Sequence, residues 1–215
     1  MSKFLLIAAL LISPFSYSAE FFIADIDSVA CENLNSSTMC VVLLLEGNIS
    51  SGDEQRLLDA IEDVSLRFKE LDISARVGKI HFNSNGGDIY EAMRLGRIIR
   101  SNLITTQITH DATCYSACVI AYLGGVLRVP VGPVGIHSFY SESFIGPENF
   151  DEASMKYNEV SEDLEQFLFE MRIPRSFLDE MQRVPSSRLK ILEYDQLEGL
   201  GILGIVPVYE QTDMQ

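Results

Sequence analysis

The chain has few of the residues on which metal sites and nucleic-acid interfaces depend. Its 215 residues include four cysteines, three histidines and no tryptophan, and 16 basic residues stand against 31 acidic ones, for a formal net charge of −15. Such an acidic chain is poorly suited to bind nucleic acid or an anionic membrane surface. The cysteines and histidines are too scattered for a zinc site, so we expect no metal and no cofactor. The apolar share of 47% still predicts a folded core.

Long apolar runs are also scarce. The run at residues 4–12 follows a single basic residue, Lys3, and precedes small residues, which is the pattern of a secretory signal peptide. It is too short to span a bilayer, which needs roughly 20 residues. An uncleaved anchor is the alternative. No later segment is long and apolar enough to span a membrane, so we expect no integral span after cleavage.

The cleavage site has two candidates. Ser16-Tyr17-Ser18 fits the small-x-small pattern and favours cleavage after Ser18, whereas cleavage after Ala19 places bulky Tyr17 three positions back. We take residues 1–19 as the signal peptide and residues 20–215 as a single domain, because no linker or repeat divides the rest. The chain is then exported, to the periplasm or to the outside of the cell.

An exported chain can keep disulfides. Cys31 and Cys40 flank a polar loop, and a bridge between them would tie down the mature N-terminus. Cys114 and Cys118 are four residues apart, close to the upper Cα separation that a disulfide tolerates in a helix. They either form a bridge or are two small buried residues that pack a helix start.

Strand-like and helix-like segments alternate along the chain. Such alternation predicts an α/β fold with a mainly parallel sheet and helical crossovers. Strands are expected at 41–49, 76–82, 103–109, 126–129 and 134–139. Helical spacing of apolar residues occurs at 57–71, 89–100 and 148–171, and again after Pro174. The apolar stripe of the 148–171 helix either packs inside the monomer or, if exposed, forms an oligomer interface.

Three places along the chain are suited to acyl-transfer chemistry. In "NSNGGD" (83–88), two adjacent glycines between a strand and a helix let backbone amides point outward, as an oxyanion hole requires, although an ordinary turn has the same composition. Ser116 lies at another strand-to-helix turn, where it is either a nucleophile or an N-cap. His137 in "VGIHSF" is either a general base or a hydrogen-bonded core residue. His110 and His81 are the other histidines.

The order of these three motifs resembles that of the Clp protease proteolytic subunit. "HFNSNGGD", "CYSAC" and "GIHSF" stand where that family has N-S-P-G-G, A-S-M-G and M-I-H, and the similarity covers roughly residues 41–205. The sequence is most similar to exported Clp-protease-like proteins with a C-x-S-A-C motif. This resemblance implies the ClpP/crotonase spiral of ββα units and assembly into homo-oligomers. It also implies site roles: nucleophile Ser116, general base His137, and an oxyanion hole from Gly86 or Gly87 with Ala117.

Two positions depart from the family pattern. Asn85 replaces a proline, which a turn tolerates. The orienting Asp of the family triad aligns with Leu189, and neither Asp179 nor Asp195 matches it. Losing such an acid can cost about 10⁴-fold in rate. Lys190 is an alternative base, although nothing in its local sequence favours it.

The sequence therefore predicts an exported serine hydrolase, an ATP-independent peptidase with a peptide or protein substrate. A crotonase-type acyl-CoA enzyme shares the implied fold but does not suit an exported chain. A non-catalytic binding or scaffold protein that keeps the fold is the other alternative, and the missing acid favours it.

Overall fold

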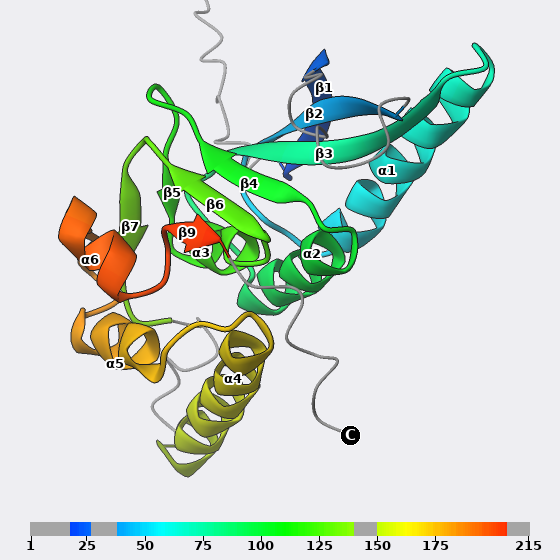
Figure 1. Ribbon diagram of the computed structural model, residues 1–215. Coiled ribbons are helices and arrows are strands. Elements are labelled where there is room, and N and C mark those ends of the chain that lie inside the picture. The colour runs from blue at the N-terminus through cyan, green and yellow to red at the C-terminus, as the bar shows by residue number, and fades with distance from the viewer. Residues whose placement is uncertain (1–17, 27–37, 140–149, 206–215) are drawn as a thin grey trace, which may run out of the picture.

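The computed structural model describes residues 18–26, 38–139 and 150–205, and these form two sheets with helices packed against them (Figure 1). The larger sheet has the order β1-β2-β3-β4-β6-β9, and the smaller one has the order β5-β7-β8. The larger sheet contains β1 (Glu20–Ile26), β2 (Thr38–Glu46), β3 (Ser74–Asn83), β4 (Thr105–Ile108), β6 (Leu127–Pro130) and β9 (Gly204–Ile205). The smaller sheet contains β5 (Cys114–Tyr115), β7 (Val134–Ile136) and β8 (Lys190–Ile191). The helices are α1 (Asp53–Lys69), α2 (Ile89–Ser101), α3 (Ala117–Tyr122), α4 (Phe150–Glu170), α5 (Arg175–Arg183) and α6 (Tyr194–Gly199).

The chain repeats one structural unit. A strand of the larger sheet is followed by a short strand or bridge of the second layer, and then by a helix: β4-β5-α3 and β6-β7-α4 are two such units. In a third, β3 leads to a bridge between Ser84 and Cys114 and then to α2. Strands β2, β3, β4 and β6 are mutually parallel, and β1 and β9 add to the edges antiparallel. The predicted α/β fold of ββα units is confirmed.

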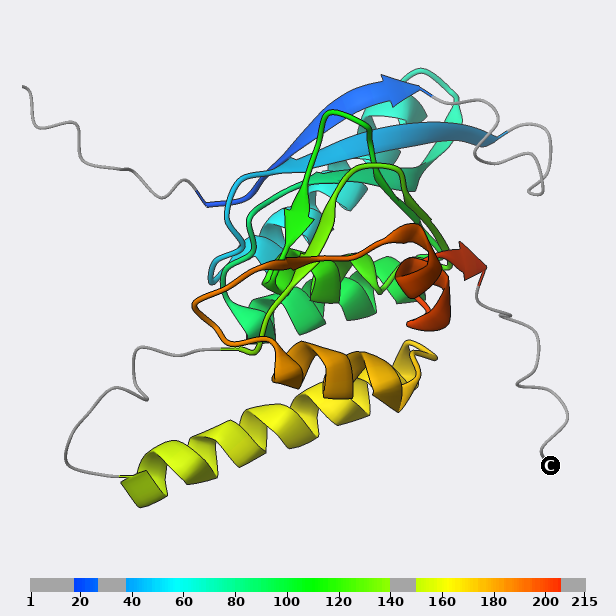
Figure 2. The ribbon, with the colours of Figure 1, turned by 90° about the vertical axis from the view of Figure 1, so that its left-hand side faces the viewer.

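The long helix α4 packs along one side of the molecule, next to α5 (Figure 2). Its predicted apolar stripe is inside the chain, because each member is at most 7% exposed. The stripe consists of Val160, Leu164, Phe167, Leu168 and Met171. Burial of these side chains fixes α4 against the core and leaves none of the stripe for contact with another subunit.

Strand β1 is an element that the sequence pattern did not predict. It pairs with β2 at the edge of the larger sheet, with Glu20 opposite Glu46. Phe22 and Ile23 remain 46% and 44% exposed, so the strand lacks the alternation of buried and exposed residues that marks a half-buried strand.

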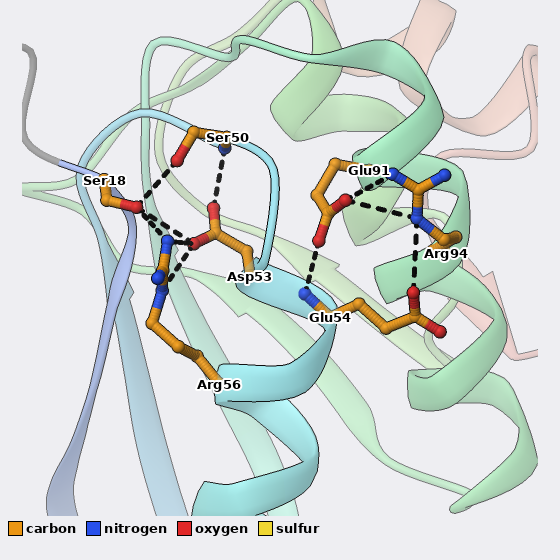
Figure 3. A network of polar contacts seen from close by, with 7 residues as sticks. All are labelled: Ser18, Ser50, Asp53, Glu54, Arg56, Glu91 and Arg94. Carbon is orange, nitrogen blue, oxygen red and sulfur yellow. Dashed lines mark hydrogen bonds and ion pairs between the residues drawn. The ribbon is translucent and has the colours of Figure 1, made fainter.

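A polar network joins the start of the described chain to α1 (Figure 3). The carboxylate of Asp53 is fully buried, and it accepts hydrogen bonds from Ser50 N at 2.7 Å, Arg56 Nε at 2.8 Å and Ser18 Oγ at 3.3 Å. Ala19, the next residue along, is also fully buried. Cleavage after Ser18 would therefore leave Ala19 in the core, whereas cleavage after Ala19 would remove a buried residue.

A second part of this network joins α1 to α2. The buried carboxylate of Glu91 accepts a hydrogen bond from the backbone amide of Glu54 and pairs with Arg94 (Figure 3). Burial opposes the charged form of Glu91, but these hydrogen bonds outweigh it and hold the pKa of the carboxyl below its ordinary value. The network thus fixes the first turn of α1 against α2, the helix that follows the glycine turn at residues 83–88.

The predicted bridge between Cys31 and Cys40 falls partly outside the described residues. Cys40 is disulfide-bonded, while Cys31 lies outside the described residues.

Within the ranges that the structure describes, no helix is both long enough and apolar enough to cross a bilayer.

Candidate active site

Ser116 lies at the sharp turn between β5 and α3. Its backbone has φ 55° and ψ −126°, a left-handed conformation that side-chain-bearing residues rarely adopt and that costs roughly 1–3 kcal/mol. The Ser116 amide donates to Gly135 O at 2.9 Å, and the Ser116 carbonyl accepts from Val119 N at 3.0 Å. Its side chain does not cap the helix. The backbone is therefore held on both sides, while the hydroxyl has no hydrogen bond to any residue that the structure describes, as in the strand-to-helix turns that present nucleophilic serines.

A disulfide closes over this turn. Cys114 in β5 and Cys118 in α3 are bridged, with their Cα atoms 5.3 Å apart and both side chains fully buried. The bridge predicted for this pair is therefore present, and the alternative of two packed thiols is wrong. Because Cys114 and Cys118 flank Ser116 by two residues each, the bridge restrains the segment with the unusual backbone.

Ser116 opens onto a cavity of about 570 Å³. Gly87, Ala117 and His137 line the same cavity, so the structure brings together the predicted nucleophile, base and two of the three predicted oxyanion residues. The apolar part of the wall consists of Ile89, Tyr90, Ile120, Phe139, Val160 and Met181. Of the three histidines, all in the described ranges, His137 alone is part of this wall.

The ring of His137 is oriented by the main chain. Its Nδ1 lies 2.7 Å from the carbonyl oxygen of Ser138, and since a carbonyl only accepts, Nδ1 carries the hydrogen of the neutral ring. Nε2 is then the unprotonated nitrogen, the form that a general base requires. Ser138 is itself held, because its amide donates to Val184 O at 2.8 Å. Among the described hydrogen bonds, none joins Ser116 to His137.

The two glycines of the 83–88 turn have different roles. The amide of Gly86 donates to Ser84 Oγ at 3.1 Å, so it is already used. The amides of Gly87 and Ala117 have no acceptor among the described residues, and both residues line the cavity. Gly86 instead allows close packing, because a Cβ there would lie 2.7 Å from Tyr115 O and 2.8 Å from Ser116 Cβ. Gly87 and Ala117 are therefore the candidate oxyanion donors, and Gly86 lets the two turns pack closely together.

Among the described hydrogen bonds, no carboxylate accepts from His137 in place of the missing triad acid. Leu189 is 42% exposed and packs on Gly135, Asp179 is ion-paired with Arg175, and Asp195 is in α6. None of the three lines the cavity, nor does Lys190, which is ion-paired with Glu180. The orienting acceptor that the structure offers is the Ser138 carbonyl, for which a sequence pattern has no signal.

The acidic residues of the cavity wall are Asp88 and Glu159. Asp88 caps α2 by accepting a hydrogen bond from Glu91 N at 2.8 Å. Tyr90 lies near both carboxylates, and its pKa is raised by burial first and then by the charges of Glu159, Asp163 and Asp88. The cavity is thus mainly apolar, and its charged residues include the basic Lys156 beside the two acids. In the described part of the chain, no three His, Cys, Asp or Glu side chains are grouped as metal ligands.

No protein-family model and no curated protein matches this sequence. Two solved structures of proteases are similar to it. An Asn-to-Asp mutant of ClpP1 from Listeria monocytogenes has a TM-score of 0.47 and 17% identity, over 75% of this chain and 88% of its own. A Ser-to-Ala mutant of the 1510-N membrane-bound stomatin-specific protease has a TM-score of 0.47 and 14% identity, over 74% of this chain and 75% of its own.

Proposed function

We propose that this protein is an exported serine hydrolase that acts on peptides without an ATP-driven partner. The observation that carries the proposal is the turn at Ser116, whose uncapped hydroxyl opens onto the same cavity as His137 and two unpaired backbone amides. A strained backbone at an accessible serine is typical of a nucleophile rather than of a structural turn.

The reaction begins with proton transfer from Ser116 Oγ to Nε2 of His137. Oγ forms a bond to the substrate carbonyl carbon, and the electron pair of the C=O bond moves to the oxygen. The amides of Gly87 and Ala117 stabilise this oxyanion. When the intermediate collapses, the scissile C–N bond breaks and the amine takes the proton from His137. Water then repeats the sequence on the acyl-enzyme, releasing the acid and restoring Ser116.

The Ser138 carbonyl replaces the triad acid as the group that orients His137. A carbonyl holds the same tautomer as a carboxylate, but it carries no full negative charge to stabilise the imidazolium that forms during the reaction. We therefore propose a slow hydrolase, with His137 positioned for each turnover but less strongly stabilised when charged.

The cavity favours unfolded peptide as the substrate. Its apolar wall accepts bulky apolar side chains, and its volume of about 570 Å³ admits more than one of them. A folded protein would have to expose such a segment first. Assembly into homo-oligomers remains part of the proposal, through a surface other than the buried stripe of α4.

Labelling with a fluorophosphonate probe tests the proposal. Wild-type protein should form a covalent adduct at Ser116, Ser116→Ala should form none, and His137→Ala should react at least about 10²-fold more slowly. Ser186→Ala is the matched control, because Ser186 lines the same cavity and should be dispensable. Ser138→Ala should also label normally, since only its carbonyl is used. Equal labelling of wild type and Ser116→Ala would end the hydrolase proposal.

A non-catalytic peptide-binding protein is the second candidate. It is favoured because, in the described structure, no carboxylate is hydrogen-bonded to His137 and no hydrogen bond joins Ser116 to His137. Such a protein would bind an unfolded peptide in the cavity without cleaving it. Peptide binding that is equal in wild type and Ser116→Ala, with no adduct in either, would select this function.

A further inference from the structure

A buried arginine on β6 has unused hydrogen-bond donors. Arg128 is 4% exposed, and its Nε and Nη1 atoms are enclosed without an acceptor. Its backbone is fixed on both sides, because Arg128 pairs with Thr106 of β4 and with Gly204 of β9. A buried guanidinium that lacks a partner strongly destabilises the folded state. The structure therefore needs negative charge and acceptors at this place.

The nearest charges have the wrong sign. Burial first, and then the charge of Arg100, lower the pKa of Arg128 to about 10, while Tyr122 opposes the shift. Arg100 is in turn close to Arg172. Of the acidic residues in the described ranges, none forms an ion pair with Arg128.

Other arginines of this acidic chain are paired. Arg56 contacts Asp53, Arg94 contacts Glu91, and Arg97 contacts Glu170. With a net charge of −15, the chain has carboxylates in excess. Arg128 is therefore unpaired because of its position in the fold and not because the chain has too few acidic residues.

Arg100 presents its charge from a fixed position. It donates to Gly124 O at 2.8 Å through Nε, and to Leu123 O at 3.2 Å and Gly125 O at 3.1 Å through Nη2. These bonds hold the guanidinium at the end of α3, near Arg128. The positive charge is thus organised before any ligand arrives, which reduces the cost of binding.

We propose that Arg128, with Arg100 beside it, binds one oxyanion, a carboxylate or phosphate group, and that the acyl-transfer site has no part in this binding. Arg128 lies opposite Gly204 of β9, an edge strand of two residues whose Ile205 is 77% exposed, so little chain separates it from the edge of the sheet. Two sources supply this chemistry. One is a free oxyanion, and the other is a carboxylate of the chain itself: Glu210 and Asp213 follow Ile205 by 5 and 8 residues in the sequence.

Thermal unfolding in rising phosphate, at an ionic strength held constant with sodium chloride, tests the site. If the ligand is free, phosphate raises the Tm of wild type saturably, by about 5–10 °C at a hundred times its Kd. Arg128→Met should lose this response. Arg67→Met is the matched control, because Arg67 is on α1 with an exposed side chain, and it should keep the response.

If the chain supplies its own carboxylate, wild type does not respond to phosphate. The double variant Glu210→Gln, Asp213→Asn should then unfold at lower temperature and gain the phosphate response. The proposal is overturned if neither wild type nor the double variant responds, or if wild type responds to phosphate and Arg128→Met responds equally. Should Arg128→Met fail to fold, calorimetric titration of phosphate into wild type and the double variant decides, and no binding to either refutes the site.

Discussion

Two strand-to-helix turns meet at the cavity, and they are built by opposite means. The turn between β3 and α2 puts its left-handed residues at Gly86, φ 102°, and Gly87, φ 141°, and ends in Asp88, which caps α2. The turn between β5 and α3 puts a serine at φ 55° and has no side-chain cap. A disulfide spans the second turn.

The residues of the first turn are those that favour stability, whereas the second turn carries the proposed nucleophile. Glycine and an N-cap are the least costly way to make such a turn, and the first turn uses both. The second turn has neither, which is what the proposed function of Ser116 requires: a hydroxyl at the bend that is not used for capping. The strain is then held in place by a covalent link and by backbone hydrogen bonds to the neighbouring β7.

The largest effect is expected at the glycine turn. In Gly87→Ala the new Cβ would lie 2.0 Å from Ile49 O at a φ of +141°, so the free energy of unfolding should fall by about 3 kcal/mol or more. Urea denaturation measures this. Gly199→Ala is the control, because a Cβ there meets nothing within 4 Å, and it should change stability little. A loss below about 1 kcal/mol in Gly87→Ala would show that this turn is not as tightly packed as described.

Removing the disulfide should affect the serine turn more than the whole fold. Closing a loop of this length, a separation of four residues, contributes about 2 kcal/mol of stability. Replacing Cys114 and Cys118 together by alanine should remove that amount and lower fluorophosphonate labelling by about tenfold or more, since small displacements of a nucleophile matter. Unchanged labelling would make the bridge purely structural. Alkylation of both thiols in unreduced protein would show that no bridge forms.

Ser116 itself offers a test of strain. Ser116→Ala and Ser116→Gly both remove the hydroxyl, but only glycine adopts a positive φ without penalty. Ser116→Gly should therefore be more stable than Ser116→Ala by about 1–2 kcal/mol, measured by thermal or urea unfolding. Equal stability of the two variants would mean that the turn is not strained, and the contrast with the glycine turn would disappear.

The smallest effect is expected at the cap of the first turn. Asp88→Ala removes the acceptor of the Glu91 amide and should cost about 1 kcal/mol, whereas Asp88→Asn keeps an acceptor and should cost a few tenths. Chemical denaturation of both variants measures the difference. If both variants lose the same amount, the carboxylate stabilises the turn through its charge and not through capping.

Elements with a clear apolar pattern could be predicted from the sequence, and the two-residue strands could not. The apolar residues of α4 recur at helical spacing over several turns, and β2 is a continuous apolar run of strand length, so both were predicted. Strands β5 and β8 contain two residues each and show no period at all, so of the smaller sheet only β7 was predicted. Strand β1 escaped prediction because it exposes apolar side chains at the edge of the sheet.

The candidate site was also predicted only in part: its side chains could be predicted, and its backbone groups could not. The residue types at Ser116, His137, Gly87 and Ala117 pointed to one cavity, and the structure places all four there. Which glycine has a free amide depends on the hydroxyl of Ser84, and what orients His137 is a main-chain carbonyl. Every residue has a carbonyl and an amide, so groups of this kind leave no trace in a sequence.

The contacts of Ser18 and Ala19 bear on the timing of maturation. A processing protease needs several residues of extended, accessible backbone around the bond that it cleaves. Once Ser18 is in the Asp53 network and Ala19 is in the core, the Ala19 side chain is withdrawn from contact with a protease in that form. If the chain is exported and cleaved as we propose, cleavage and folding compete for the same segment: a chain that folds first would resist processing, and one that is cut during translocation would fold with its new end already in place.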